Sequence, residues 1–310
     1  MAGGDESTHR AATRLVTSGR SGDFASDVVN PPVWRASTHL YPDCAALRAR
    51  KSDNRDGQFF YGRRGSPTQW ALSEALTALE PGAAGTVLYP SGLAALVGAL
   101  LTVLRSGDVL LVADNAYDPT RSAATGLLKD LGIEHRFFDP LDHEAFAGAF
   151  CDRTRAVMLE VPGSLTMEVC DIPALSAIAR GRGAVSLIDN TWATALGFPA
   201  LEHGCDIAIT ALTKHVGGHS DVMMGAASAG ERWYRRLRLG AQRLGSVQFR
   251  ARGRGRCRAV PAGRSAGTVR HRLQLGRVRK PRPAVRRRTG SFCDALAQAR
   301  LERSGPPWHT

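Results

Sequence analysis

Short apolar runs alternate with helical segments between Tyr61 and Ala229, and this alternation limits the fold more than any other feature. Such βα units predict an α/β protein whose mainly parallel central sheet is covered by helices on both faces. In sheets of this kind ligands bind at the carboxyl ends of the strands. The pattern predicts strands at 86–89, 108–112, 133–138, 156–159, 184–188, 207–211 and 223–227, with helices at 93–104, 122–131 and 172–180.

The positive charge is concentrated in one segment of the 310-residue chain. The net charge is +13, but residues 251–290 contain thirteen Arg, one Lys and no Asp or Glu, which leaves −1 for the other 270 residues. Acid-free, Arg- and Gly-rich sequence cannot bury much apolar surface. We therefore interpret residues 248–310 as a disordered or frame-shifted tail, with a short helix possible at 291–300. A nucleic-acid partner is not expected for the remainder of the chain.

Cysteine usage and hydropathy indicate a cytoplasmic protein. The six cysteines form no CxxC pair, which argues against a zinc ribbon or a disulfide scaffold, and no metal site is predicted. The first twenty residues lack an apolar leader, and the longest apolar run, 93–104, is too short to span a bilayer. We expect no membrane partner.

The segment Ile209–Asp221 contains the first candidate for chemistry, Lys214. Gly217 and Gly218 permit a close approach of the backbone to a buried ligand. A lysine in such a loop can bond covalently to an aldehyde cofactor. The local motif fits an exposed lysine in a glycine turn equally well.

An aspartate at the end of a predicted strand strengthens the case for a cofactor. Asp189 lies 25 residues before Lys214, and a carboxylate at a strand end can keep a pyridine nitrogen protonated, so that the ring accepts electrons. A strand-terminal Asp that caps a turn is the alternative. The pair at this spacing within a βα pattern favours the cofactor interpretation.

Three weaker signals lie elsewhere in the sequence. Gly92 and Leu93 open a helix after the possible N-cap Ser91, and helix N-termini bind phosphate. An arginine beside a tyrosine, as in Tyr61 and Arg63, also suits phosphate, although a solvated basic turn is the commoner case. Tyr117 would stack on a ring, although a lone Tyr is more often a packed core residue.

Taken together, these segments resemble the Cys/Met-metabolism family of pyridoxal-phosphate (PLP) enzymes of fold type I. The string 162–169 favours the family's carbon–sulfur β-lyase branch over its γ-lyases and γ-synthases. The resemblance runs from about residue 13 to residue 243. It is carried by the strings Val29–Val33, Phe60–Gly65, Pro162–Val169, Ile188–Ala193, Thr213–His215 and Gly218–Asp221.

The resemblance implies a role for each candidate. Lys214 would bind the PLP aldehyde and move the substrate's Cα proton, Asp189 would pair with the ring nitrogen, and Tyr117 would stack on the ring. The phosphate would be held by Gly92, Leu93 and Thr213, and by Tyr61 and Arg63 of a neighbouring subunit, which implies a homodimer or homotetramer. The implied reaction cleaves L-cystathionine to homocysteine, pyruvate and ammonia, or releases sulfide from cysteine.

The expected domains are an N-terminal arm at 1–60, a PLP-binding catalytic domain at 61–247 and the tail at 248–310. The family's small C-terminal domain, which would bring an arginine for the substrate α-carboxylate, is missing or garbled here, because residues 245–310 do not resemble it. Two alternatives remain open. One is a γ-lyase or γ-synthase of the same family, and the other is a degenerate enzyme whose Arg-rich tail binds nucleic acid.

Overall fold

The structure, a computed structural model, describes residues 10–20, 28–52 and 57–247. The tail predicted at 248–310, with its short helix at 291–300, lies outside the described residues. The predicted boundaries of the arm, the catalytic domain and the tail therefore stay predictions.

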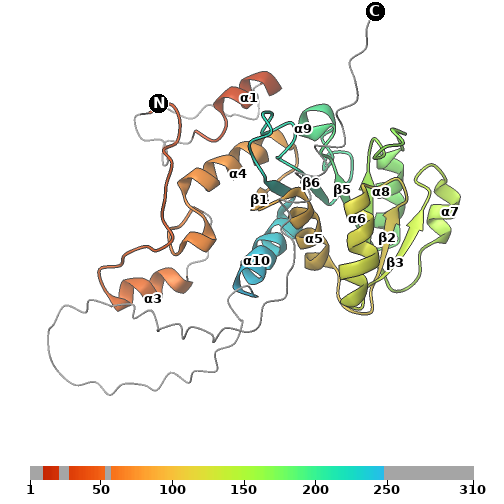
Figure 1. Cartoon of the computed structure of the whole chain (residues 1–310), viewed down its shortest axis with the longest axis horizontal. Coiled ribbons are helices and arrows are strands. Elements are labelled where there is room, and N and C mark those ends of the chain that lie inside the picture. The colour runs from red at the N-terminus through yellow and green to blue at the C-terminus, as the bar shows by residue number, and fades with distance from the viewer. Residues whose placement is uncertain (1–9, 21–27, 53–56, 248–310) are drawn as a thin grey trace, which may run out of the picture. The chain divides into compact units, whose positions relative to one another are not determined.

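A seven-stranded sheet forms the centre of the described fold, in the order β1-β7-β6-β5-β4-β2-β3 (Figure 1). The predicted α/β class with a mainly parallel sheet is confirmed, because β7 alone among these strands runs antiparallel to its neighbours. The strands are β1 (Gly85–Tyr89), β2 (Val109–Ala113), β3 (Glu134–Phe138), β4 (Thr154–Glu160), β5 (Val185–Asp189), β6 (Ile207–Thr210) and β7 (Gly225–Ala229).

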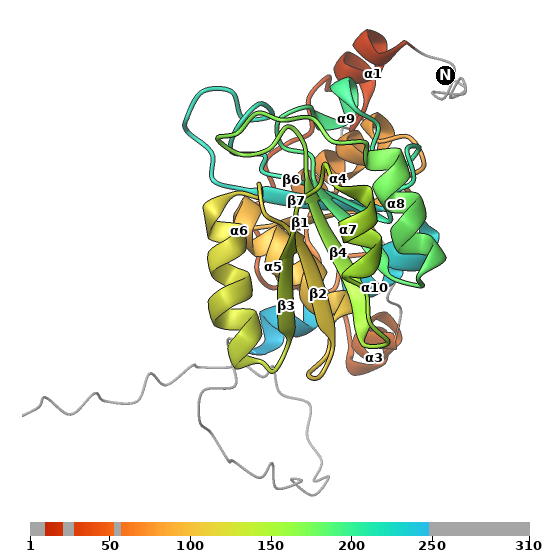
Figure 2. The same cartoon turned by 90° about the vertical axis from the view of Figure 1, so that its right-hand side faces the viewer.

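Helices cover both faces of the sheet (Figure 2). Helices α5 and α10 pack on one face and α8 on the other. The helical elements are α1 (Ala11–Thr17), α3 (Cys44–Ser52), the 3₁₀ turn η2 (Gly62–Arg64), α4 (Pro67–Leu79), α5 (Gly92–Val103), α6 (Asp118–Ala123), the π-helical turn η3 (Ala124–Leu128), α7 (His143–Gly148), α8 (Ile172–Gly181), α9 (Thr194–Gly197) and α10 (Glu231–Val247).

Two apolar cores lie against opposite faces of the sheet, and β2 contributes to both. Leu110 and Val112 belong to the core beneath α5, whereas Val109 and Leu111 belong to the core beneath α8. Successive side chains of a strand point to opposite faces, so a continuous apolar run serves both cores. This is why β2 has no polar face in the sequence.

One predicted helix begins earlier than expected, and several helices were not expected from the sequence: α1, α3, α4, α7, α9 and α10. The helix expected at 122–131 begins at Asp118, because Pro119 occupies its first turn, where no backbone donor is needed. No element was expected at α10, whose buried side chains include Trp233 and Leu237 among a run of arginines. So narrow an apolar stripe is hard to see in such a basic sequence.

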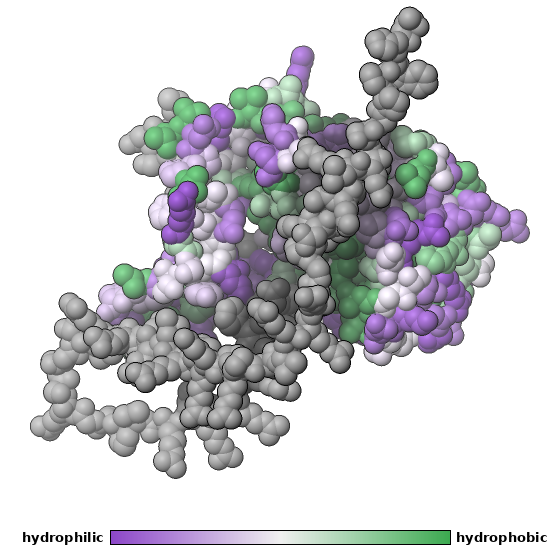
Figure 3. All heavy atoms as spheres, viewed as in Figure 1, coloured by the Kyte–Doolittle hydropathy of each residue, from purple (hydrophilic) through white to green (hydrophobic). Residues whose placement is uncertain are grey.

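Strand β3 forms a charged edge of the sheet. Glu134 pairs with Arg136 at 3.0 Å and with Arg153 at 2.5 Å, all three side chains being substantially exposed. Hydrophilic and hydrophobic side chains both reach the surface over this end of the sheet (Figure 3). Charges on an edge strand discourage pairing with another chain.

Among the helices in the described ranges, none is long and apolar enough to cross a membrane.

Candidate active site

The strands place the predicted site residue Asp189 at the same edge of the sheet as Tyr89. Tyr89 ends β1 and Asp189 ends β5, and these strands run in the same direction. Strand β7 runs the opposite way, so its first residue, Gly225, pairs with Tyr89 at this edge. The carboxyl edge predicted to bind a ligand is therefore where the candidate residues gather.

Asp189 occupies a desolvated position at this edge. Its Oδ1 accepts hydrogen bonds from the backbone N–H of Thr191 at 3.0 Å and from the Thr191 hydroxyl at 2.5 Å. Burial nevertheless raises the pKa of the Asp189 carboxyl above its usual range, against the opposing effect of these hydrogen bonds. Oδ2 has no hydrogen-bond partner among the described residues, which leaves one oxygen available to a cationic group.

Thr191 connects Asp189 to the lysine loop. Its hydroxyl oxygen accepts a hydrogen bond from the backbone N–H of Ala211 at 2.8 Å, and its hydroxyl proton is donated in a hydrogen bond to Asp189. The carbonyl of Ala211 in turn accepts the backbone N–H of Lys214 at 3.0 Å. A three-bond path thus fixes the backbone of Lys214 relative to the Asp189 carboxyl.

Lys214 lies in a tight turn with an exposed side chain. Its carbonyl accepts the N–H of Gly218 at 2.8 Å, and Gly218 has a φ of +76°, which favours glycine. The ammonium of Lys214 makes no hydrogen bond or ion pair with any residue that the structure describes. An uncommitted amine in a loop tied to the Asp189 edge by hydrogen bonds suits covalent bonding to an aldehyde.

The first turn of α5 packs closely against the lysine loop. Ser91 caps the helix, as predicted, by accepting the N–H of Ala94 at 3.1 Å. A Cβ added at Gly92 would lie 2.6 Å from Cβ of Ala211, and one added at Gly225 would overlap the carbonyl of Ser91. The backbone N–H groups of Gly92 and Leu93 have no acceptor in the described part of the chain, so they are free to bind an anion.

The hydroxyl of Thr213 is engaged within the loop. It donates to the carbonyl of Met224 at 3.1 Å and accepts the N–H of Met224 at 3.0 Å. Its single proton is therefore committed here to the backbone. The predicted donation from Thr213 to a phosphate would require this hydroxyl to rotate, and the role stays a prediction.

Tyr117 lies at the start of α6 with a half-exposed side chain. Its backbone N–H donates to Oε2 of Glu160 at 2.7 Å. Glu160 ends β4 and is the direct register partner of Asp189. Tyr117 is thus attached, through Glu160, to the same edge as Asp189, and the stacking of its ring on a ligand stays a prediction.

Two predicted residues lie away from this edge. Arg63 donates to the carbonyl of Gln242 at 3.2 Å, near the point where Gly240 packs against Thr102. Thr102 is ten residues along α5 from Gly92, which is about 15 Å at 1.5 Å per residue. The structure therefore does not bring Arg63, or its neighbour Tyr61 in the same short turn, to Lys214 of the same chain.

Sequence reasoning missed two residues at the edge, Thr191 and Glu160. Glu160 is an acid that directly follows the apolar run Ala156–Leu159, as Asp189 follows its own run, and this parallel was a usable signal. Thr191 gave no comparable signal, because its importance comes from a contact with Ala211, twenty residues away. No cluster of three or more potential metal ligands occurs in the described ranges.

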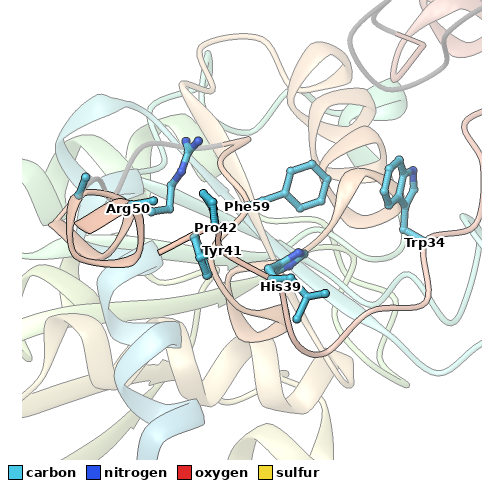
Figure 4. Close-up of a pocket in the computed structure, with 9 residues that line it drawn as sticks. Trp34, His39, Tyr41, Pro42, Arg50 and Phe59 are labelled. Atoms are coloured by element: carbon cyan, nitrogen blue, oxygen red, sulfur yellow. The ribbon is translucent and has the colours of Figure 1, made fainter. Parts of the chain in front are cut away.

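A separate cavity of about 790 Å³ lies in the N-terminal arm (Figure 4). Trp34 and His39 lie close to Phe59 on its wall, with ring centroids 5.4 and 4.9 Å from that ring. Tyr41 donates its hydroxyl proton to the carbonyl of Phe60 at 2.8 Å. None of the candidate residues at the strand edge lines this cavity.

The chain is similar to known proteins along most of its length. The family described as Cys/Met metabolism PLP-dependent enzyme matches residues 12–251. Cystathionine beta-lyase MetC of Escherichia coli is 38% identical over 237 residues, 76% of this chain. Cystathionine beta-lyase of Salmonella typhimurium is 40% identical over 237 residues, also 76% of this chain. The chain spans 60% of the length of each relative.

A solved structure shares the fold. The crystal structure of metB from Corynebacterium glutamicum superposes with a TM-score of 0.71 at 26% sequence identity. The likeness covers 78% of this chain and 61% of that one. The sequence relatives and the solved structure each match about three quarters of the chain.

Proposed function

Because the chain belongs to the Cys/Met-metabolism family of PLP-dependent enzymes, we propose that its strand edge binds PLP and cleaves the Cβ–S bond of L-cystathionine. The products would be homocysteine, pyruvate and ammonia, with one water consumed. Cysteine would give sulfide by the same bond cleavage. The similarity to two cystathionine beta-lyases supports the β-lyase reaction.

The site has the features that PLP requires. Asp189 offers a desolvated carboxyl with one free oxygen, which suits a protonated ring nitrogen. The first turn of α5 offers free N–H groups, and its glycine packs so closely on Ala211 that the backbone itself forms the cradle. The link from Asp189 through Thr191 to the lysine loop is the observation that carries this proposal.

Each residue would have a separate task. Lys214 would bond to the cofactor aldehyde and, once released, move a proton between Cα and the leaving sulfur. Asp189 would hold the ring nitrogen in its charged form, Gly92 and Leu93 would bind the phosphate, and Tyr117 would cover the ring. The cofactor, when bound, supplies an electron sink for the Cα carbanion.

A second copy of the chain would complete the phosphate site. Arg63 contacts Gln242 beside the far end of α5, away from Lys214 of its own chain, and Tyr61 lies in the same short turn. This position supports a role for both residues at the site of a neighbouring copy. We therefore propose a homo-oligomer with shared sites.

Borohydride reduction of the PLP-loaded chain, followed by peptide mass spectrometry, tests the cofactor assignment. Reduction should leave the PLP mass on the peptide that contains Lys214. The Lys214→Ala variant should carry none, whereas Lys129→Ala, which changes an exposed lysine after η3, should be labelled like the wild type. Full labelling of Lys214→Ala would contradict the assignment.

Product analysis tests the reaction itself. A β-lyase releases pyruvate from cystathionine, whereas a γ-lyase releases 2-oxobutyrate. Pyruvate that depends on Lys214 supports the proposal, and 2-oxobutyrate would assign the chain to the γ-branch. A chain that is labelled at Lys214 but releases neither product would refute the lyase reaction while leaving the cofactor site intact.

A further inference from the structure

Glu160 and Asp189 form a partly buried pair of acids at the strand edge. They are the last residues of adjacent parallel strands and lie opposite one another in the register, so their side chains leave the same face of the sheet. Neither carboxyl forms an ion pair with a described residue. Two acids in such a position cannot both be charged at low cost.

Glu160 also holds the start of α6. Its Oε2 accepts the backbone N–H of Tyr117 at 2.7 Å, and Tyr117 is followed directly by the first residue of the helix. One side chain thus touches the backbone of the residue proposed to cover the ring and neighbours the acid proposed to pair with the ring nitrogen. In the described residues, no other side chain links the backbone of Tyr117 to Asp189.

The charges around Glu160 come mainly from Asp189. Burial first, and then the charge of Asp189, raise the pKa of Glu160 to about 7, against the hydrogen bond from Tyr117. The acids beside β2 interact with one another instead: burial, and then the charges of Asp139 and Glu168, raise the pKa of Asp114 against the effect of Arg121. Protonation of Glu160 is therefore coupled to the charge that Asp189 carries.

We propose that Glu160 is a positioning residue of the cofactor site, which fixes the backbone of Tyr117 and adjusts the charge available next to Asp189. The inference rests on the proposed function, because the ring that Tyr117 and Asp189 would hold is that of PLP. A cation bound at Asp189 favours ionisation of the neighbouring acid. By linkage, cofactor affinity should then rise with pH while Glu160 loses its proton near neutral pH.

Titration of the full chain with PLP at pH 6 and pH 8 tests this inference. In Glu160→Gln the amide oxygen still accepts the Tyr117 N–H, so the Kd at pH 6 should stay within about twofold of wild type. The gain in affinity from pH 6 to pH 8 should be about three- to tenfold smaller than in wild type, since one pKa unit corresponds to a tenfold effect. The titrations of PLP itself cancel in this comparison.

Two further variants separate charge from structure. Glu160→Ala removes the acceptor for the Tyr117 N–H and should weaken PLP binding about tenfold at pH 6. Its loss should be larger at pH 8, because this variant also lacks the carboxylate charge. Asp114→Asn changes an exposed acid at the end of β2 and should leave the pH effect unchanged. If Glu160→Ala does not fold, Glu160→Gln carries the test alone.

The outcomes for the inference and for the proposed function are distinct. A wild-type pH effect in Glu160→Gln overturns the inference, whatever Glu160→Ala does. Failure of the wild-type chain to hold PLP at Lys214 overturns the proposed function instead. A smaller pH effect in Glu160→Gln, with Lys214 labelled as in wild type, supports both.

Discussion

The hydroxyl of Thr191 donates a 2.5 Å hydrogen bond to Oδ1 of Asp189. The same hydroxyl accepts the backbone N–H of Ala211, at the start of the lysine loop. One oxygen atom therefore sets the distance between the two halves of the proposed cofactor site.

Replacing Thr191 with Val should loosen this link. The partly buried carboxyl of Asp189 loses one donor and the N–H of Ala211 loses its acceptor, at a cost of about 1–3 kcal/mol in the free energy of unfolding. Urea denaturation measures this cost, and PLP titration should show weaker binding. Thr191→Ser keeps the hydroxyl and should behave like wild type; a Ser variant as weak as the Val variant would show that the methyl group matters instead.

Gly92→Ala should damage the contact between α5 and the lysine loop. The new Cβ would lie 2.6 Å from Cβ of Ala211, and overpacking of this kind costs about 1–3 kcal/mol. Thermal unfolding and PLP affinity should both fall. Gly126→Ala is the matched control, because its Cβ would meet no atom within 4 Å and helix propensity favours Ala. Equal stability of the two variants would contradict the close packing.

Stability should fall as the pH rises through neutrality because of Glu80. Burial raises the pKa of this carboxyl from 4.5 to about 7, although it accepts the N–H of Leu201 at 3.1 Å. The folded state then binds a proton that the unfolded state releases between about pH 4.5 and 7. Linkage makes the loss on the order of 3 kcal/mol over that window, and Glu160 acts in the same direction.

Urea midpoints at pH 5 and pH 8 measure this effect. Glu80→Gln keeps an acceptor for Leu201 and removes the charge, so its midpoint should change less between the two pH values than that of wild type. Glu202→Gln removes an exposed charge that makes the smallest contribution to the raised pKa of Glu80, so it should keep most of the wild-type pH dependence. A Glu80→Gln variant with the full wild-type change would refute the role of Glu80.

Two inactive variants should complement each other if sites are shared between copies. Arg63→Ala should weaken PLP binding about tenfold or more through loss of a charged phosphate contact, and Lys214→Ala should abolish covalent labelling. In a mixture of the two, dimers with one copy of each contain one intact site. About a quarter of the wild-type labelled sites should then return at a PLP concentration near the wild-type Kd.

The control for this experiment mixes two variants of the same half-site. A mixture of the Lys214→Ala protein with the Asp189→Ala protein should recover no labelled sites. Both changes fall in the part of the site that one chain supplies, so every mixed dimer has two defective sites. Recovery in neither mixture would mean that Arg63 does not serve a neighbouring copy.

The sequence by itself determined the sheet and the candidates at its edge. Apolar runs such as Val109–Val112 have no polar face, so they predict strands buried on both faces, and parallel strands place Tyr89 and Asp189 together at one edge. Lys214 and Asp189 were predicted as a pair, because their spacing within a βα pattern and the family strings around them favour a cofactor site, although neither local motif is specific by itself. These inferences depend on neighbours along the chain, which a sequence displays directly.

Tertiary structure decided the connections between the candidates. Only the folded chain places Thr191 against Ala211 and pairs Glu160 with Asp189, because these contacts join residues more than fifteen positions apart. It also placed Arg63 near the far end of α5, in contact with α10. Helix α10 was not predicted from the sequence, because its many arginines hide its apolar positions. The physical reason is that hydrogen bonds and burial between strands depend on register and packing, which no local pattern records.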